Sequence, residues 1–176
     1  RTHYQASIRS YMNQFELLSQ SDVKKLILES KSTTCELDFI PTPKLKENVE
    51  CFLPSVTEIV NKSLTSGVFP QNWKDAVIKP LLKKKGLSLE LRNYRPVSNL
   101  SFLSKILEKA ALHQITSHIE TNNLLPSYQS AYRKNHGVET ALIKMYDDLL
   151  MAVDQGQITI VVMIDLSAAF DTIDIP

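Results

Sequence analysis

The chain has 176 residues, of which 43% are hydrophobic and 22% charged, and its formal net charge is +1. This composition is typical of a globular protein and excludes an intrinsically disordered one, and the length is that of about one domain. No apolar run reaches the ~20 residues of a membrane span, and the N-terminus lacks the apolar core of a signal peptide.

These absences predict an intracellular protein, in the cytoplasm or nucleus, that is neither secreted nor bound to a membrane. The two cysteines, Cys35 and Cys51, lie far apart in the sequence and form no CxxC motif. They fit neither a disulfide framework nor a zinc site, so we expect reduced thiols.

The first 65 or so residues predict short helices without recognisable catalytic chemistry. Ser21 and Asp22 can cap a helix whose apolar face includes Val23. Residues 37–43 contain two prolines and predict an extended connector. Pro54 is suited to the first turn of a further helix, which Gly67 would end.

After Trp73 the hydrophobic period changes to that of a strand. Ala76, Ile78, Pro80 and Leu82 alternate with more basic positions, so we expect one apolar face turned inward and one basic face outward. Lys79 and Lys83 would point the same way. A solvated edge strand protected by lysines would show a similar pattern.

The basic residues between Lys74 and Lys109 outnumber the acidic ones, and Arg95 is the most informative of them. Pro96 restricts Arg95 to an extended conformation, which projects the guanidinium away from the chain. The planar guanidinium suits bidentate phosphate contact. The alternative is an ordinary surface ion pair with Glu90.

Two amphipathic helices are predicted next, over residues 101–120 and from Val138 to about Gly156, and the second is expected to pack in the core. His113 and His118 lie on the first, but their spacing is not that of metal ligands on a helix.

The run from Gln157 to Ile164 is β-branched and almost uniformly apolar, which predicts a strand buried on both faces. Asp165 closes it, and a buried carboxylate requires a partner. A metal ion is the simplest one, since Mg²⁺ is commonly held by one or two carboxylates and substrate phosphates. The small residues Ala168 and Ala169 would let a ligand approach the backbone, and Phe170 follows them.

Five stretches together resemble the reverse transcriptases of LINE-type (non-LTR) retrotransposons, in the order in which that family has them. They are Phe69 to Lys84, Asn93 to Ser98, Leu103 to Lys109, Gln129 to Lys134, and Asp165 to Asp174. The resemblance implies an α+β fold, with the fingers and first palm strand of a right-hand polymerase after a helical N-terminal extension. The implied division is a connector at 1–65, fingers at 66–156 and the start of a truncated palm at 157–176.

The resemblance also implies roles for individual residues. Asp165 would be catalytic and hold Mg²⁺, and Phe170 would be the steric gate that favours deoxynucleotides. Arg133 and the backbone at Ala168 and Ala169 would bind the incoming deoxynucleoside triphosphate. Lys79, Lys83, Arg95 and Lys134 would contact the RNA template or DNA primer.

Two departures from the family qualify this interpretation. The family has Gly-Phe where this chain has Ala131-Tyr132, which alters the local backbone if a positive φ is needed there. The later aspartate motif of the family is missing. Tyr146-Asp147-Asp148 only resembles that motif, since these residues lie on a predicted helix that precedes Asp165.

We therefore expect a reverse transcriptase fragment that does not polymerise by itself. The competing hypothesis is a non-catalytic RNA-binding or structural remnant of a decayed transposon. A third, an unrelated α/β metal hydrolase, would require further ligands after a second strand, and the sequence shows none.

Overall fold

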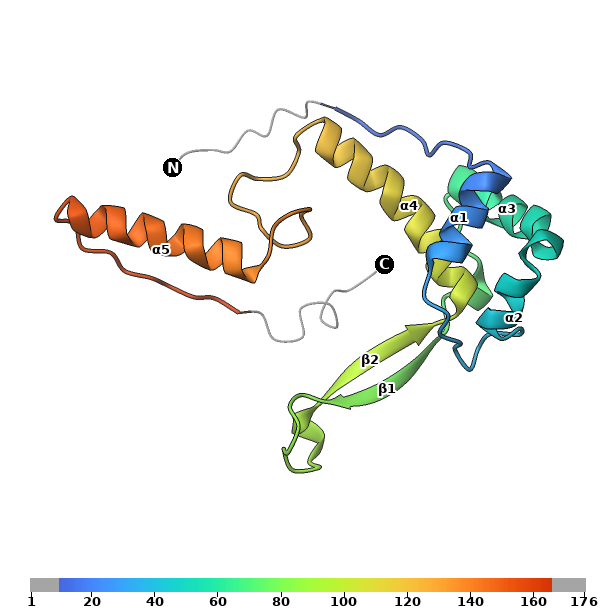
Figure 1. Cartoon of the computed structure of the whole chain (residues 1–176), viewed down its shortest axis with the longest axis horizontal. Coiled ribbons are helices and arrows are strands. Elements are labelled where there is room, and N and C mark those ends of the chain that lie inside the picture. Colours follow the sequence, from blue (N-terminus) through green and yellow to red (C-terminus); the bar gives the residue numbers. More distant parts are fainter. Residues whose placement is uncertain (1–9, 166–176) are drawn as a thin grey trace. The chain divides into compact units, whose positions relative to one another are not determined.

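The computed structural model describes residues 10–165. Its elements, in chain order, are α1 (Gln20–Glu29), α2 (Thr42–Glu47), α3 (Val49–Ser66), a 3-10 turn (Gln71–Trp73), β1 (Ala76–Leu82), a second 3-10 turn (Leu91–Asn93), β2 (Tyr94–Leu100), α4 (Phe102–Thr121) and α5 (Val138–Asp154) (Figure 1). The mixture of helices with one two-stranded sheet in the described residues agrees with the predicted α+β class. The chain forms two compact units, Arg1–Leu124 and Leu125–Pro176. The finer division into connector, fingers and palm stays a prediction.

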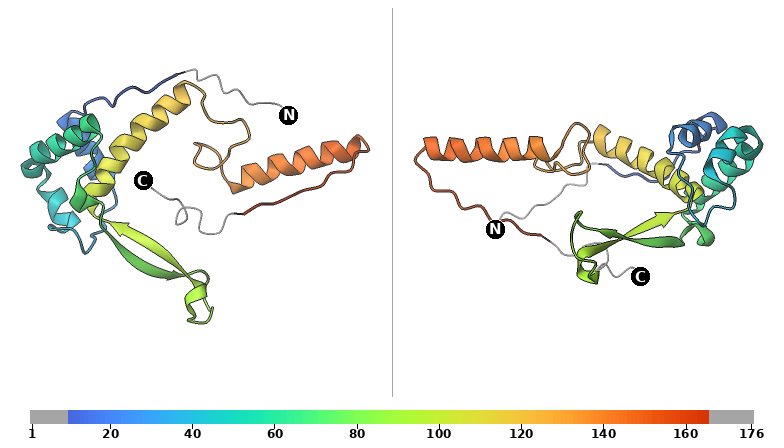
Figure 2. Two further views of the ribbon diagram at one scale, coloured as in Figure 1. Left: turned by 180° about the vertical axis from the view of Figure 1, so that it is seen from behind. Right: turned by 60° about the horizontal axis from the view of Figure 1, so that its bottom comes forward.

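The first unit is built around a core shared by four helices. Helix α1 lies against both α3 and α4 (Figures 1 and 2). Its Val23 and Ile27 are completely buried, as are Val60 of α3 and Ile106 of α4. Burying each such side chain stabilises the fold by roughly 1.5–3 kcal/mol. The core therefore joins helices that the sequence divides between the connector and the fingers.

Helix α1 begins with a reciprocal cap whose N-cap residue is Ser19, which was not predicted; of the predicted pair Ser21 and Asp22, Asp22 is the second member of this cap. The Ser19 hydroxyl accepts a hydrogen bond from the Asp22 backbone N–H, and the Asp22 carboxylate accepts one from the Ser19 backbone N–H, at 3.0 Å. Hydrogen bonds from the Ser19 side chain and backbone lower the pKa of Asp22.

The C-terminus of α1 receives its positive charge from other helices. The α1 sequence has no basic residue in its last turn. Lys46 of α2 donates to the carbonyls of Leu28 and Ser30, and Lys109 of α4 donates to the Ser30 hydroxyl at 2.8 Å. Cations at this end are favoured by the helix dipole, so these lysines have a structural role.

Helix α3 begins earlier than the sequence predicted. It starts at Val49, and Pro54 lies inside it and not in its first turn. The apolar side chains of Val49 and Leu53, which precede the proline, are part of the core. Their burial stabilises the helical turn on the N-terminal side of Pro54. Gly67 ends the helix as predicted, with a φ of 69° and its N–H bonded to the Ser63 carbonyl at 3.0 Å.

Strands β1 and β2 form an antiparallel hairpin whose register runs from Ala76 opposite Leu100 to Leu82 opposite Tyr94. The hairpin leads away from the helices of its unit (Figure 1). The predicted inward apolar face is absent, since Ile78 is 64% exposed and Ala76 and Pro80 on the same face are exposed as well. A sheet of two strands buries neither face unless another element covers it, and no described helix does so.

In the second unit, α5 forms over the predicted residues, but the prediction that it packs in the core is wrong. None of its residues is buried, and Leu142 and Val153 are 53% and 65% exposed. The predicted strand over residues 157–164 is also wrong. This segment has no regular secondary structure and is exposed, because a strand needs a neighbour and no described residue pairs with it.

No helix in the described part of the chain is both long and apolar enough to cross a membrane. Cys35 is buried and Cys51 is exposed, and both are free thiols, as predicted.

Two serines at the start of α4 should respond oppositely to substitution by alanine. The Ser101 hydroxyl caps the helix by accepting from the Ser104 N–H, so Ser101→Ala should lower the free energy of unfolding by about 1 kcal/mol. The Ser104 hydroxyl is fully buried without a hydrogen-bond partner among the described residues, so Ser104→Ala should leave that energy unchanged or raise it by up to about 1 kcal/mol. Urea denaturation measures both, and equal losses would contradict this account.

Candidate nucleic-acid interface

The register of the hairpin places three basic residues on one face. Residues directly opposite each other in an antiparallel pair share a face, and Lys79 lies opposite Val97 while Leu81 lies opposite Arg95. The Lys83 N–H continues this ladder by donating to the Asn93 carbonyl at 2.8 Å. Lys79, Lys83 and Arg95 therefore lie on the same face, which we call the basic face.

The side chains of the basic face make only weak surface contacts. Lys79 pairs with Glu36 at 3.1 Å, the Lys83 ammonium donates to the Arg92 carbonyl at 2.8 Å, and an Arg95 Nη2 donates to the Lys83 carbonyl at 3.3 Å. An exposed ion pair contributes little, ~0–1 kcal/mol. These cations can therefore exchange their present partners for phosphate at small cost.

The alternative interpretation of Arg95, a surface ion pair with Glu90, is not supported. Glu90 pairs with Arg92, whose Nε lies 2.8 Å from the Glu90 Oε2, and not with Arg95. Arg95 lies in β2 and is exposed, in the extended conformation that Pro96 predicted. Its guanidinium has no carboxylate partner among the described residues.

The base of the hairpin is held by Asp38, for which no role was predicted from the sequence. Its two carboxylate oxygens accept from the backbone N–H groups of Cys35 and Phe102, each at 2.6 Å. The Cys35 thiol donates to the Asn99 carbonyl at 3.3 Å. Asp38 thus ties the loop before α2 to the point where β2 passes into α4.

Part of the basic excess in the sequence has a structural role and does not belong to the basic face. Lys105 donates to the Asn99 side chain at 2.8 Å, and Lys109 donates to Ser30. Both lysines lie on α4, where they connect the helix to its neighbours. Counting lysines along the sequence therefore overstates the charge available to a ligand.

The remaining predicted site residues belong to the second unit or lie outside the described residues. Arg133 is half-buried and Lys134 is exposed, both in the loop before α5. Asp165 is exposed at the end of the irregular segment after α5. Ala168, Ala169 and Phe170 lie outside the described residues, so their predicted roles are not addressed by the structure.

The described residues do not form a metal site by themselves. Within residues 10–165, no three His, Cys, Asp or Glu side chains are grouped so that they could hold an ion. His118 lies 3.1 Å from the Ser10 hydroxyl, which gives it a packing contact. Asp147 and Asp148 are exposed on α5, as their placement on a predicted helix implied.

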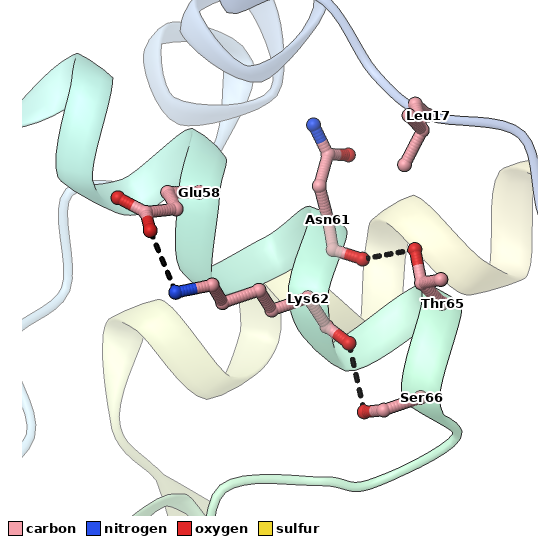
Figure 3. A pocket seen from close by; sticks show the side chains of 6 residues that line it. All are labelled: Leu17, Glu58, Asn61, Lys62, Thr65 and Ser66. Carbon is pink, nitrogen blue, oxygen red and sulfur yellow. Dashed lines mark hydrogen bonds and ion pairs between the residues drawn. The ribbon is translucent and has the colours of Figure 1, made fainter.

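A surface depression of about 660 Å³ lies along α3, but its polar groups bond to one another (Figure 3). Lys62 pairs with Glu58 at 2.7 Å, and this contact lowers the pKa of Glu58. Thr65 and Ser66 donate to backbone carbonyls one turn earlier. With its hydrogen-bonding groups satisfied internally, the depression offers little to a ligand.

Two exposed aromatic side chains beside the Arg133-Lys134 pair were not predicted from the sequence. Tyr128 and Tyr132 are 81% and 91% exposed. A positive φ of 59° occurs at Tyr132 and not at Ala131, the position where the family has glycine. The available signal was two tyrosines, the second followed directly by two basic residues, within residues 128–134. Aromatic side chains combined with positive charge are typical of single-strand binding.

Comparison with known proteins identifies the class of this chain. Residues 82–176 match the family described as "Reverse transcriptase (RNA-dependent DNA polymerase)", and the chain belongs to that family. Three of its relatives come from Drosophila melanogaster. The chain is 29% identical over 115 residues to the RNA-directed DNA polymerase from mobile element jockey, and 30% identical over 115 residues to the probable RNA-directed DNA polymerase from transposon BS. It is 27% identical over 118 residues to the probable RNA-directed DNA polymerase from transposon X-element. These relatives confirm the predicted non-LTR retrotransposon type.

The matches cover 65–67% of this chain and 13% of each relative, so the chain spans about an eighth of their length. No solved structure matches. The family acts on RNA templates and nucleotides and generally uses a divalent metal. The matched range includes Lys83, Arg95, Arg133, Lys134 and Asp165, whereas Lys79 precedes it.

Asp38 and Glu36 provide a matched pair of substitutions at the base of the hairpin. Asp38→Ala leaves the backbone N–H groups of Cys35 and Phe102 without their acceptor, so the free energy of unfolding should fall by about 2 kcal/mol or more. Glu36→Ala removes only an exposed ion pair and should cost less than about 0.5 kcal/mol. Urea denaturation that finds equal costs would show that Asp38 does not anchor the hairpin.

Proposed function

We propose that this chain supplies a nucleic-acid-binding part of a reverse transcriptase that carries out RNA-directed DNA synthesis. The observation that supports this proposal is the basic face of the hairpin, within a chain of the reverse transcriptase family. The ligand of this face is the phosphate backbone of the RNA template or the DNA primer.

The physical basis of binding is local charge. A net charge of +1 is too small to attract a polyanion on its own. Three cations on one face of an exposed hairpin can nevertheless contact successive phosphates, and each contact releases counterions from the nucleic acid. The Arg95 guanidinium can form two parallel hydrogen bonds with one phosphate, whereas each lysine acts as a point charge.

The roles of the other predicted residues belong to the same proposal. Arg133 would hold the triphosphate of the incoming deoxynucleotide together with the backbone at Ala168 and Ala169, and Lys134 would contact nucleic acid. Phe170 would exclude nucleotides that carry a ribose 2′-hydroxyl. These roles are supported by the position of the residues within the matched range.

Asp165 is proposed as the catalytic carboxylate and as one ligand of Mg²⁺ in a longer polymerase. The described residues do not complete such a site, so no reaction step is assigned to this chain. We further propose the predicted division into connector (1–65), fingers (66–156) and start of palm (157–176). We also propose that the protein is intracellular, in the cytoplasm or nucleus.

Removing the basic face should reduce both RNA affinity and its salt dependence. In a variant with Lys79→Gln, Lys83→Gln and Arg95→Gln, the slope of log K against log salt should decrease by about 2, since each phosphate contact to a single strand contributes roughly 0.7. Fluorescence anisotropy with a labelled single-stranded RNA measures this. Glu36→Gln should strengthen binding, because it releases Lys79 from its ion pair.

The matched control neutralises three lysines that form ion pairs on the helices. Lys25, Lys44 and Lys62 are exposed, and their replacement by glutamine makes the same change in net charge. We expect a much smaller change of slope. If the control weakens binding as much as the hairpin variant, the interaction is non-specific and the basic face is not the site.

The purified chain should not synthesise DNA by itself, because Asp165 is the only one of its 176 residues that the resemblance assigns to the catalytic carboxylates. Primer extension with an RNA template, a DNA primer, all four deoxynucleotides and Mg²⁺ is the measurement. Template-dependent incorporation that disappears in Asp165→Asn would contradict this expectation. Binding of RNA without incorporation would leave the non-catalytic alternative as the present role of the chain.

A further inference from the structure

The loop before α5 contains two hydrogen-bonded turns that bracket Tyr132. In the first, the Gln129 N–H donates to the Pro126 carbonyl at 3.0 Å. In the second, the His136 N–H donates to the Arg133 carbonyl at 3.2 Å. The Gln129 side-chain amide also donates to the Ala131 carbonyl at 3.2 Å. The backbone on both sides of Tyr132 is therefore constrained.

Between these turns, Tyr132 adopts a conformation that is unfavourable for its residue type. Its φ of 59° is in the left-handed region, which bulky side chains rarely occupy. The side chain gains little from packing in return, since Tyr132 is 91% exposed. Strain of this kind is concentrated at functional sites, where it fixes the direction of a side chain in advance.

We propose that Tyr132 is a stacking platform for an unpaired nucleobase of a single-stranded RNA. This inference rests on the proposed function and extends it from phosphate contact to base contact. Arg133 and Lys134 follow directly in the sequence and would hold the adjoining backbone phosphates. An exposed aromatic ring beside cations is the chemistry by which proteins bind single strands without reading their sequence.

Tyr128 is the natural comparison because it is a second exposed tyrosine in the same loop. The Lys144 ammonium lies 5.4 Å from the centroid of its ring, which is the geometry of a cation–π contact. One face of the Tyr128 ring is therefore already engaged. Its φ is not positive, unlike that of Tyr132. The ring faces of Tyr132, free of such a contact within the described residues, and its positive φ therefore make it, and not Tyr128, the tyrosine that stacks on the nucleobase.

The test compares two single-stranded RNA oligonucleotides of equal length and charge, one with bases and one abasic, by fluorescence anisotropy with the full chain. The unsubstituted chain should prefer the oligonucleotide with bases by at least about fivefold, since the range expected for one stacked base is roughly 5- to 150-fold. Tyr132→Gly tolerates the positive φ but lacks the ring, so it should abolish the preference. Tyr132→Phe should retain it, and Tyr128→Gly should change it less than twofold.

A preference that survives in Tyr132→Gly, or that Tyr128→Gly also removes, would overturn the assignment. Salt-dependent binding of both oligonucleotides without any preference would overturn stacking alone and leave phosphate binding intact. If the chain binds neither oligonucleotide, both proposals fail. A free deoxynucleoside triphosphate that competes only for the base-dependent part would show that the stacked base belongs to the incoming nucleotide.

Discussion

The packing of α1 against α4 determines how the first unit is organised. Val23 and Ile27 of α1 and Ile106 of α4 are completely buried, and the lysines Lys46 and Lys109 bind the C-terminal end of α1 from two other helices. Because α4 begins directly after β2, a fixed α4 also fixes the origin of the hairpin. Asp38 strengthens that junction through two backbone N–H groups. The basic face, which has almost no packing of its own, depends on this core for its position.

The two units differ in how well they bury apolar surface. The first has a closed core, whereas α5 in the second has no buried residue and the apolar segment after it is exposed. The candidate functional features occur in segments with little burial: an exposed hairpin in one unit and an exposed loop in the other. Such placement is common for binding residues, because a group that must contact a ligand cannot also be covered by its own fold.

Local patterns predicted most of the regular elements. The period of apolar residues indicated α4 and α5, and Gly67 marked the end of α3. Lys79 and Lys83 were expected on one side of a strand, and the register confirms it. The prediction was wrong where it depended on what covers an apolar face. An apolar run such as residues 157–164 shows that burial would be favourable, but a strand forms only when a neighbour is available.

The sequence by itself determined the family and the types of chemistry present, because the motifs from Phe69 to Asp174 are short and local and can be read without contacts. It also determined the helices whose apolar spacing is regular. Only the tertiary structure decided that Arg95 joins Lys79 and Lys83 on one face, that Lys105 and Lys109 are structural, and that Tyr132 carries the positive φ. Strand register, ion-pair partners and backbone strain arise between residues distant in sequence or from the closure of a turn, so no local pattern encodes them.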